Sequence, residues 1–244
     1  MKTILLSETD LHRGPLILIN RAHPLQPCAV ALQTLYWKEK RIPLEARAAS
    51  LLQACVRACG GTGLIVPVSG WRSHAEQMEI WNDSLAEHGR AFTESYVARP
   101  GCSEHESGLA IDLAKAAAEI DFIRPDFPYD GVCGAFRRSA ADYGFIERYR
   151  AEKRPLTGIA AEPWHFRYVG APHAVLIEKN GLCLEEYAPF LQRNGEQVCR
   201  LANGKCARVR YIPWTGAAME ICPPKSCWQI SGDNAGGFIL TLWE

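Results

Sequence analysis

The pattern of apolar and polar residues divides the chain into a body of mixed helices and strands and a tail of short strands. Up to about residue 194, segments with helical spacing of apolar residues alternate with segments of extended character. After Gly195 only short extended segments follow, separated by turn residues. The pattern therefore predicts an α+β domain over residues 1–194 and a small all-β extension over residues 195–244.

The helices of the body are predicted from apolar residues spaced three or four apart. They are expected at residues 44–59, 73–89, 132–143, 172–180 and 184–193. Gly60-Gly61 ends the first helix, and the capping box made by Ser73 and Glu76 begins the second. Pro172 and Gly181 stand where a first turn and a helix end favour these residue types.

Strands are expected in both parts of the chain. In the body they cover residues 15–19, 63–69, 108–113 and 165–169, and in the tail residues 196–202, 205–212, 217–222, 226–231 and 237–243. Pro67 has no amide hydrogen, so it places its strand at a sheet edge or at a bulge. Asn203-Gly204 indicates a tight hairpin turn between the first two strands of the tail.

Composition limits the classes of partner and location. The chain of 244 residues carries 27 basic and 27 acidic residues, so its formal net charge of zero gives no support to a nucleic-acid partner. No apolar run is long enough to span a bilayer, and the N-terminus lacks the long apolar core of a secretory signal. The spacing of the ten cysteines fits no compact disulfide framework, so we expect reduced thiols and a cytoplasmic protein.

The first segment with candidate chemistry is Ser103-Glu-His105-Glu-Ser-Gly108-Leu-Ala-Ile-Asp112. Gly108 allows a tight turn before the strand begins. Along that strand Asp112 points to the face opposite the large aliphatic residues on either side of it. A carboxylate in such a place needs a partner, because burying it alone costs much free energy. A metal ion is a natural partner.

The second segment is Glu162-Pro-Trp-His165-Phe-Arg-Tyr168. His165 lies three residues after Glu162, so a short turn can bring both side chains to one site. With His105 and Asp112, His165 supplies three protein ligands and leaves zinc one open coordination position, as in catalytic zinc sites. Such a centre lowers the pKa of a bound water, and Glu162 is the candidate to take its proton. Arg72, where a strand gives way to a helix, is the candidate to stabilise an oxyanion.

Three segments, in this order along the chain, resemble the VanY-type D-Ala-D-Ala carboxypeptidases. They are Ser-Gly-Trp-Arg-Ser around Arg72, Ser-x-His-x-x-Gly-x-Ala-x-Asp from Ser103, and Glu-Pro-Trp-His-Phe-Arg-Tyr-Val-Gly from Glu162. The similarity extends to VanX dipeptidases and bifunctional VanXY enzymes, and it covers roughly residues 15–190. It implies a small central antiparallel sheet that carries the zinc site between flanking helices, as in the Hedgehog/DD-peptidase-like folds.

The resemblance also implies roles for individual residues. These are zinc binding by His105, Asp112 and His165, catalysis by Glu162 and Arg72, and substrate binding by Ser103, Trp164 and Gln77. The implied function is a zinc-dependent D,D-peptidase that removes terminal D-alanine from peptidoglycan precursors and also splits free D-Ala-D-Ala. Two alternatives stay open. One is a cell-wall endopeptidase of the L-Ala–D-Glu type, and the other is a metal-containing binding module without catalysis.

Other polar residues receive a structural interpretation. Glu104 and Glu106 flank His105 and are expected in solvent. The remaining histidines are expected at the surface without a role: His12, His23, His74, His88 and His173. Four cysteines of the tail lack the paired spacing of zinc knuckles, so core packing is expected for Cys199, Cys206, Cys222 and Cys227.

Overall fold

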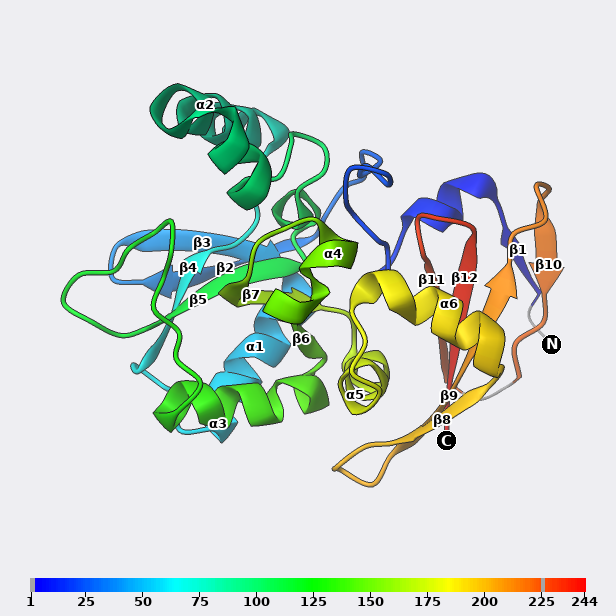
Figure 1. Ribbon diagram of the computed structural model, residues 1–244. Coiled ribbons are helices and arrows are strands. Elements are labelled where there is room, and N and C mark those ends of the chain that lie inside the picture. The colour runs from blue at the N-terminus through cyan, green and yellow to red at the C-terminus, as the bar shows by residue number, and fades with distance from the viewer. Residues whose placement is uncertain (1–2, 225–226) are drawn as a thin grey trace.

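The computed structural model describes residues 3–224 and 227–244 and has the predicted α+β architecture (Figure 1). A four-stranded antiparallel sheet, in the order β4-β5-β7-β6, forms the centre of the body. A second four-stranded antiparallel sheet, in the order β11-β12-β9-β8, forms the C-terminal part. In Figure 1, α1 and α3 lie on one side of the central sheet and α2 on the other.

The helices are α1 (Ala46–Ala58), α2 (His74–Tyr96), α3 (Gly131–Ala140), α4 (Arg154–Thr157), α5 (Ala171–Lys179) and α6 (Leu184–Asn194). Short 3-10 helices are η1 (Glu8–His12), η2 (Glu104–Ser107), η3 (Ala141–Tyr143) and η4 (Ala151–Lys153). The strands are β1 (Ile4–Leu6), β2 (Leu32–Trp37), β3 (Lys40–Glu45), β4 (Ile65–Ser69), β5 (Ala110–Lys115), β6 (Phe145–Tyr149), β7 (Glu162–Tyr168), β8 (Gln197–Arg200), β9 (Cys206–Pro213), β10 (Met219–Ile221), β11 (Trp228–Gly232) and β12 (Gly237–Trp243).

The core of the body lies between α1, α3 and one face of the central sheet. Ile111 and Phe166, on neighbouring strands, are fully buried in the same cluster as Leu52 of α1 and Phe136 of α3. Because successive strand residues point to opposite faces, Asp112 and His165 must lie on the other face, beneath α2. The alternation predicted along β5 is therefore confirmed, and β7 alternates in the same way.

Two local predictions in the body are confirmed. Pro67 lies in β4, an edge strand, and the β4–β5 register shifts between Pro67 and Ser69. The shift inserts one extra residue into β4 and places Ser69 opposite Asp112. Ser73 and Glu76 form the predicted capping box of α2. Gly89, the predicted end, has φ of 76° and interrupts the helix, which then continues to Tyr96.

The strand predicted over residues 15–19 is wrong, although its apolar residues are buried. Leu16, Ile17 and Ile19 are each at most 3% exposed. Their segment pairs with no strand, because the Arg167 guanidinium donates to the carbonyls of Pro15 and Ile17 in place of a ladder. The β2–β3 hairpin and β6 were not predicted from the apolar pattern.

The C-terminal sheet follows the predicted order of strands. The Asn203-Gly204 turn joins β8 to β9, as predicted, and β11 and β12 match the last two expected strands. Residue 226, the first of one expected strand, lies outside the described residues. β1 pairs with β10, so the N-terminal segment contributes to this part of the fold. The division between residues 194 and 195 remains a prediction.

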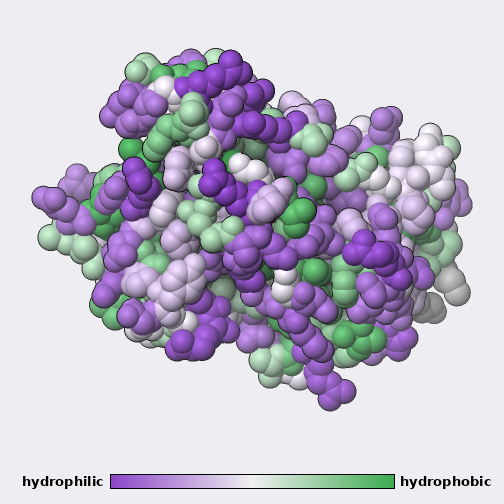
Figure 2. Space-filling view, in the orientation of Figure 1, coloured by the Kyte–Doolittle hydropathy of each residue, from purple (hydrophilic) through white to green (hydrophobic). Residues whose placement is uncertain are grey.

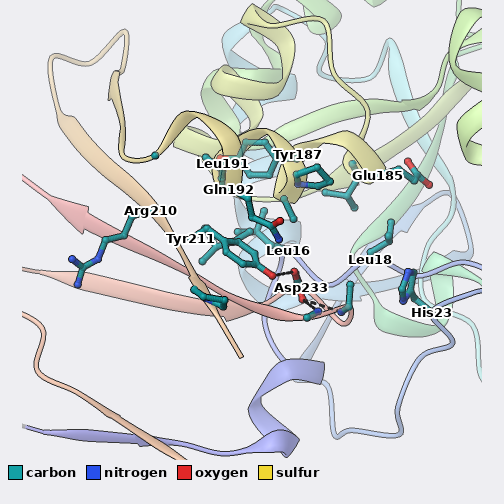
Figure 3. Close-up of a pocket in the computed structure, with 18 of the residues that line it drawn as sticks. Leu16, Leu18, His23, Glu185, Tyr187, Leu191, Gln192, Arg210, Tyr211 and Asp233 are labelled. Atoms are coloured by element: carbon teal, nitrogen blue, oxygen red, sulfur yellow. Dashed lines mark hydrogen bonds between the residues drawn. The ribbon is translucent and has the colours of Figure 1, made fainter. Parts of the chain in front are cut away.

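A cavity of ≈ 860 Å³ lies between α6, the C-terminal sheet and residues 16–18 (Figure 3). Tyr187 and Leu191 of α6 face Tyr211 of β9 across it. The Tyr211 hydroxyl donates to Asp233 Oδ2 over 2.8 Å, and the other oxygen of Asp233 accepts from the backbone amides of residues 235–237, where the turn enters β12. Asp233 thus fixes the β11–β12 turn against β9.

The expectation that His173 lies at the surface is wrong. Its side chain is buried between the body and the C-terminal sheet. Its Nδ1 lies 2.8 Å from the Tyr187 hydroxyl and its Nε2 2.9 Å from the Thr241 hydroxyl of β12. Hydroxyls can donate or accept, so a neutral ring is satisfied at both nitrogens. Burial lowers the pKa of His173 to about 3.

The expectation of buried tail cysteines is only partly met. Cys199 is buried, Cys206 is half-buried, and Cys222 and Cys227 are exposed. Figure 2 shows hydrophilic side chains over most of one face of the molecule. None of the helices in the described part of the chain is long and apolar enough to cross a membrane.

The buried His173 predicts a loss of stability on mild acidification. As pH falls below about 6.5 the unfolded chain takes up a proton at this histidine, whereas the folded chain does not until about pH 3. Between pH 7.5 and 5.0 the wild type should therefore lose about 2 kcal/mol of unfolding free energy that a His173→Gln variant does not lose. Urea unfolding of both proteins, with a chelator present throughout, measures this difference. Equal losses in both would contradict the interpretation.

Candidate metal centre

Three potential metal ligands meet on the face of the central sheet beneath α2. Asp112 on β5 lies directly opposite His165 on β7, and η2 brings His105 beside them. Asp112 Oδ1 is 3.0 Å from His165 Nδ1, and Asp112 Oδ2 is 3.2 Å from His105 Nε2. A ligand atom from each of the three residues lies within 4.8 Å of the others, and all three side chains are buried.

These distances and donors fit a tetrahedral zinc ion. Zinc–nitrogen and zinc–oxygen bonds of about 2.0–2.1 Å separate neighbouring ligand atoms by roughly 3.3 Å. The distances from the histidine nitrogens to Asp112, each to a different carboxylate oxygen, are 3.0 and 3.2 Å. The donor set of two imidazoles and one carboxylate also leaves a coordination position for water or substrate. The predicted ligands are therefore placed where zinc could be held.

The tautomer of His105 is set by a backbone carbonyl. His105 Nδ1 lies 2.7 Å from the Gly70 carbonyl oxygen, which can only accept, so Nδ1 donates and Nε2 presents its lone pair to the site. A side chain at Gly70 would place a Cβ 2.2 Å from the Pro43 carbonyl oxygen. Glycine at this position therefore lets the backbone come close enough to orient His105.

The electrostatics of the site call for a cation. Burial opposes ionisation of Asp112, but His105 and His165 outweigh it and hold the pKa of Asp112 well below its usual range. Burial likewise opposes a charged His165, yet Asp112, Glu104 and Glu162 raise its pKa to about 9. Buried carboxylates thus surround the ring and favour positive charge at this place, which a divalent ion would supply.

Glu162 reaches the centre through a β-bulge rather than the turn expected from the sequence. Glu147 pairs with Phe166 and Tyr149 with Glu162, so three residues of β7 lie between these pairs where β6 has one. Such irregularities re-aim side chains, and here Glu162 Oε2 comes within 3.7 Å of His165 Nδ1. Burial, with the nearby Asp112 charge, raises the pKa of Glu162 to about 8 despite the opposing effect of His165.

Arg72 lies beside the three ligands and is held in place. Its Nη2 is 3.3 Å from Asp112 Oδ2, and its Nε and Nη2 both donate to the Ser69 hydroxyl. Its Nη1 donates to Gln77 Oε1 over 3.2 Å. Gln77 is 1% exposed and donates in turn to the Ala98 carbonyl, so it anchors Arg72.

The remaining predicted residues line the same cleft, which encloses ≈ 400 Å³. Ser103 is buried at the start of η2, makes no cap hydrogen bond with its side chain, and lines the cleft. Trp164 is half-buried and packs on the core cluster while lining the cleft. Four exposed apolar or aromatic side chains also line the cleft: Ile80, Tyr96, Phe122 and Ile123.

The expectation that Glu104 and Glu106 are solvated is wrong. Glu104 is 1% exposed and its Oε1 accepts from Arg148 Nε at 2.8 Å and Arg167 Nη1 at 2.7 Å. Glu106 is also buried, and it accepts from the Gly101 amide. Residues of a 3-10 turn do not alternate between two faces, so the sequence offered no signal that both carboxylates turn inward.

Tyr149, at the end of β6, is a cleft residue that the sequence analysis missed. Its ring centroid lies 4.9 Å from that of His165, and burial raises its pKa well above the usual range. The Arg148 guanidinium carbon lies 4.8 Å from the Tyr149 ring centroid. The motif spacing carries no information on β6, which was itself not predicted.

Comparison with known proteins agrees with this geometry. Residues 41–171 match the VanY family model, described as D-alanyl-D-alanine carboxypeptidase. A bifunctional D-Ala-D-Ala dipeptidase and carboxypeptidase of Enterococcus gallinarum, VanXYC, is 40% identical over 185 residues, which cover 74% of this chain and 96% of the relative.

Solved structures extend the similarity to the whole fold. The vancomycin resistance D,D-dipeptidase VanXYg, solved with a D-Ala-D-Ala phosphinate analogue, superposes with a TM-score of 0.95 at 42% identity, over 100% of this chain and 99% of that one. A mutant VanY D,D-pentapeptidase in complex with Zn(II) has a TM-score of 0.61 at 32% identity, over 71% of this chain and 98% of that one. By the family match and these similarities together, the chain belongs to the VanY family of D-alanyl-D-alanine carboxypeptidases.

Proposed function

We propose that this protein is a zinc-dependent D,D-peptidase that hydrolyses D-Ala-D-Ala, both at the end of peptidoglycan precursors and as the free dipeptide. The observation that carries the proposal is the buried His105–Asp112–His165 cluster with the Glu162 carboxylate beside it in one cleft. The relatives named as a bifunctional dipeptidase and carboxypeptidase and as a D,D-dipeptidase support the substrate class.

His105, Asp112 and His165 would hold the zinc ion. When bound, the ion supplies a Lewis acid that polarises the scissile carbonyl and lowers the pKa of water. Every other part of the reaction falls to side chains of this chain.

Glu162 is assigned the transfer of a proton. Its carboxylate lies 3.7 Å from His165 Nδ1, at the edge of the ligand cluster, and burial raises its pKa to about 8. A carboxylate at this place in the cleft can take a proton from the attacking water and return it to the leaving amine. The same residue thereby serves as general base and then as general acid.

Arg72 is assigned to stabilise the negative charge that develops on the carbonyl oxygen. Ser69 and Gln77 hold its guanidinium in place, so this positive group is oriented before the substrate binds. Gln77 accepts from Arg72 through Oε1 and donates to the Ala98 carbonyl through Nε2, so it supports Arg72 directly. Its contact with substrate remains a prediction.

Ser103 and Trp164 are assigned to the substrate pocket. Ser103 lines the cleft, where its hydroxyl can donate to the terminal carboxylate of D-Ala-D-Ala, and Trp164 offers an apolar wall for a methyl group. A cytoplasmic location completes the proposal and is supported by ten cysteines that are all free thiols.

The proposed function is tested by D-alanine release from the zinc-loaded protein. UDP-MurNAc-pentapeptide and free D-Ala-D-Ala are given in parallel, each with and without a chelator. Release from both, abolished by the chelator, is the expected result. Release from one substrate alone would restrict the activity to the carboxypeptidase or the dipeptidase side. With zinc bound, the absence of release from either would overturn the proposal in favour of an endopeptidase or a binding module.

Replacing Glu162 separates proton transfer from metal binding. Glu162→Ala should lower kcat by at least about 10²–10⁴-fold, the usual contribution of a general acid–base group. Zinc content should stay at the wild-type level, because the three ligands are intact. Glu152→Ala, at an exposed glutamate in η4, is the matched control and should leave kcat unchanged. Activity retained by Glu162→Ala would remove this residue from the mechanism.

Replacing Arg72 tests the oxyanion assignment. Arg72→Ala should lower kcat by about 10²–10³-fold, as the loss of one oxyanion donor does in other hydrolases. Arg41→Ala removes an exposed arginine of β3 and serves as the control. Because Arg72 also contacts Asp112, zinc content is measured in both variants. An Arg72→Ala enzyme that loses zinc but keeps its kcat on reloading would contradict the assignment.

A further inference from the structure

One oxygen of the Glu104 carboxylate accepts two hydrogen bonds, and the other accepts none. Oε1 accepts from Arg148 and Arg167, at 2.8 and 2.7 Å. Oε2 lies 3.5 Å from His165 Nε2. Within the described chain, these two facing atoms are the buried side-chain nitrogen and oxygen atoms that have no hydrogen-bond partner. An imidazole nitrogen and a carboxylate oxygen that are otherwise unpartnered therefore face each other next to the metal centre.

The two nitrogens of His165 point in different directions. Nδ1 faces Asp112 Oδ1 at 3.0 Å and Glu162 Oε2 at 3.7 Å, so Nδ1 is the nitrogen directed to the metal centre. A neutral imidazole has one N–H and one lone pair. If Nδ1 binds the ion, the proton must therefore be on Nε2, which faces Glu104.

We propose that Glu104 is a positioning residue of the metal centre: its Oε2 accepts the Nε2–H of His165 and so holds the tautomer whose Nδ1 lone pair faces the ion. The inference rests on the zinc site of the proposed function and extends it beyond the three ligands. Hydrogen bonds of this kind from a carboxylate to a ligating histidine fix the ring orientation and raise its basicity as a ligand.

The neighbours of Glu104 hold its carboxylate in this orientation. Arg148 binds Glu104 through Nε and uses its other two nitrogens for a bidentate pair with Glu185 of α6. Arg167 binds Glu104 through Nη1 and the carbonyls of residues 15 and 17 through Nη2. With both guanidiniums tied on their far sides, Oε1 cannot turn away, and Oε2 stays directed at His165.

The two histidines of the centre would then be held in opposite tautomers by different acceptors. The Gly70 carbonyl fixes the proton of His105 on Nδ1, which leaves Nε2 for the ion. Glu104 fixes the proton of His165 on Nε2, which leaves Nδ1. Each ring is held by an acceptor on the side away from the ligands, so its other nitrogen is oriented toward the metal position.

The Glu104→Gln variant tests this role directly. The amide oxygen can still accept from Arg148 and Arg167, which leaves the amide NH₂ facing His165 Nε2. A donor at that place favours a lone pair on Nε2 and a proton on Nδ1, the wrong tautomer for the site. The zinc dissociation constant should rise about 10–100-fold, the usual effect of removing such a partner. Competition with a chromophoric chelator measures it.

Glu185→Gln is the matched control. It makes the same chemical change in the same buried cluster, on the far side of Arg148 from His165. Thermal unfolding of both zinc-free variants reports how far each change weakens the fold. The proposal expects weaker zinc binding in Glu104→Gln and wild-type binding in Glu185→Gln. Wild-type zinc binding by Glu104→Gln, or an equal loss in both variants, would overturn it.

A second measurement does not depend on whether the variant folds. In ¹⁵N NMR of the zinc-loaded wild type, His165 should show a directly bonded proton on Nε2 and a metal-bound Nδ1. Zinc bound through Nε2 would overturn the proposal. Neither measurement uses turnover, so a wild-type protein that binds zinc as described but releases no D-alanine would refute the proposed function and leave the role of Glu104 intact.

Discussion

The cross-strand pairing of Asp112 with His165 is the constraint on which the site depends. Both residues lie on interior strands of the central sheet, and their opposite faces bury Ile111 and Phe166 in the core. A slip of one residue would move the core side chains to the site and the ligands into the core. The hydrophobic packing of the sheet therefore fixes the register that brings two metal ligands together.

Buried charge is the cost of this arrangement. Glu104, Arg148 and Arg167 are almost completely inaccessible, and burying such groups costs several kcal/mol each before their mutual attraction is counted. Hydrophobic residues of similar volume are often as stable as a buried ion pair. The charges are thus better explained by the site than by the stability of the fold. They surround His165 with fixed partners and leave one carboxylate oxygen directed at it.

Much of the site could be predicted from the sequence, because the ligands follow simple periodicity. Asp112 and His165 alternate with large apolar residues, and that pattern assigns their face without knowledge of the partner strand. Glu162 was expected near His165, but the β7 bulge that delivers it depends on pairing with β6, which the pattern did not reveal. Glu104 was placed in solvent because a 3-10 turn has no two-fold alternation, and its partners Arg148 and Arg167 are distant in sequence.

The same chain of contacts reaches the C-terminal part of the molecule. Arg148 joins Glu104 to Glu185 at the start of α6, and α6 packs through Leu191 against Val209 and Ile239 of the C-terminal sheet. Arg167 joins Glu104 to the backbone of residues 15–17, and Leu16 is buried in that same C-terminal cluster. Both guanidiniums behind Glu104 are therefore held by elements that the C-terminal sheet supports. The sheet contributes no metal ligand, yet it helps to determine how firmly the carboxylate behind His165 is held.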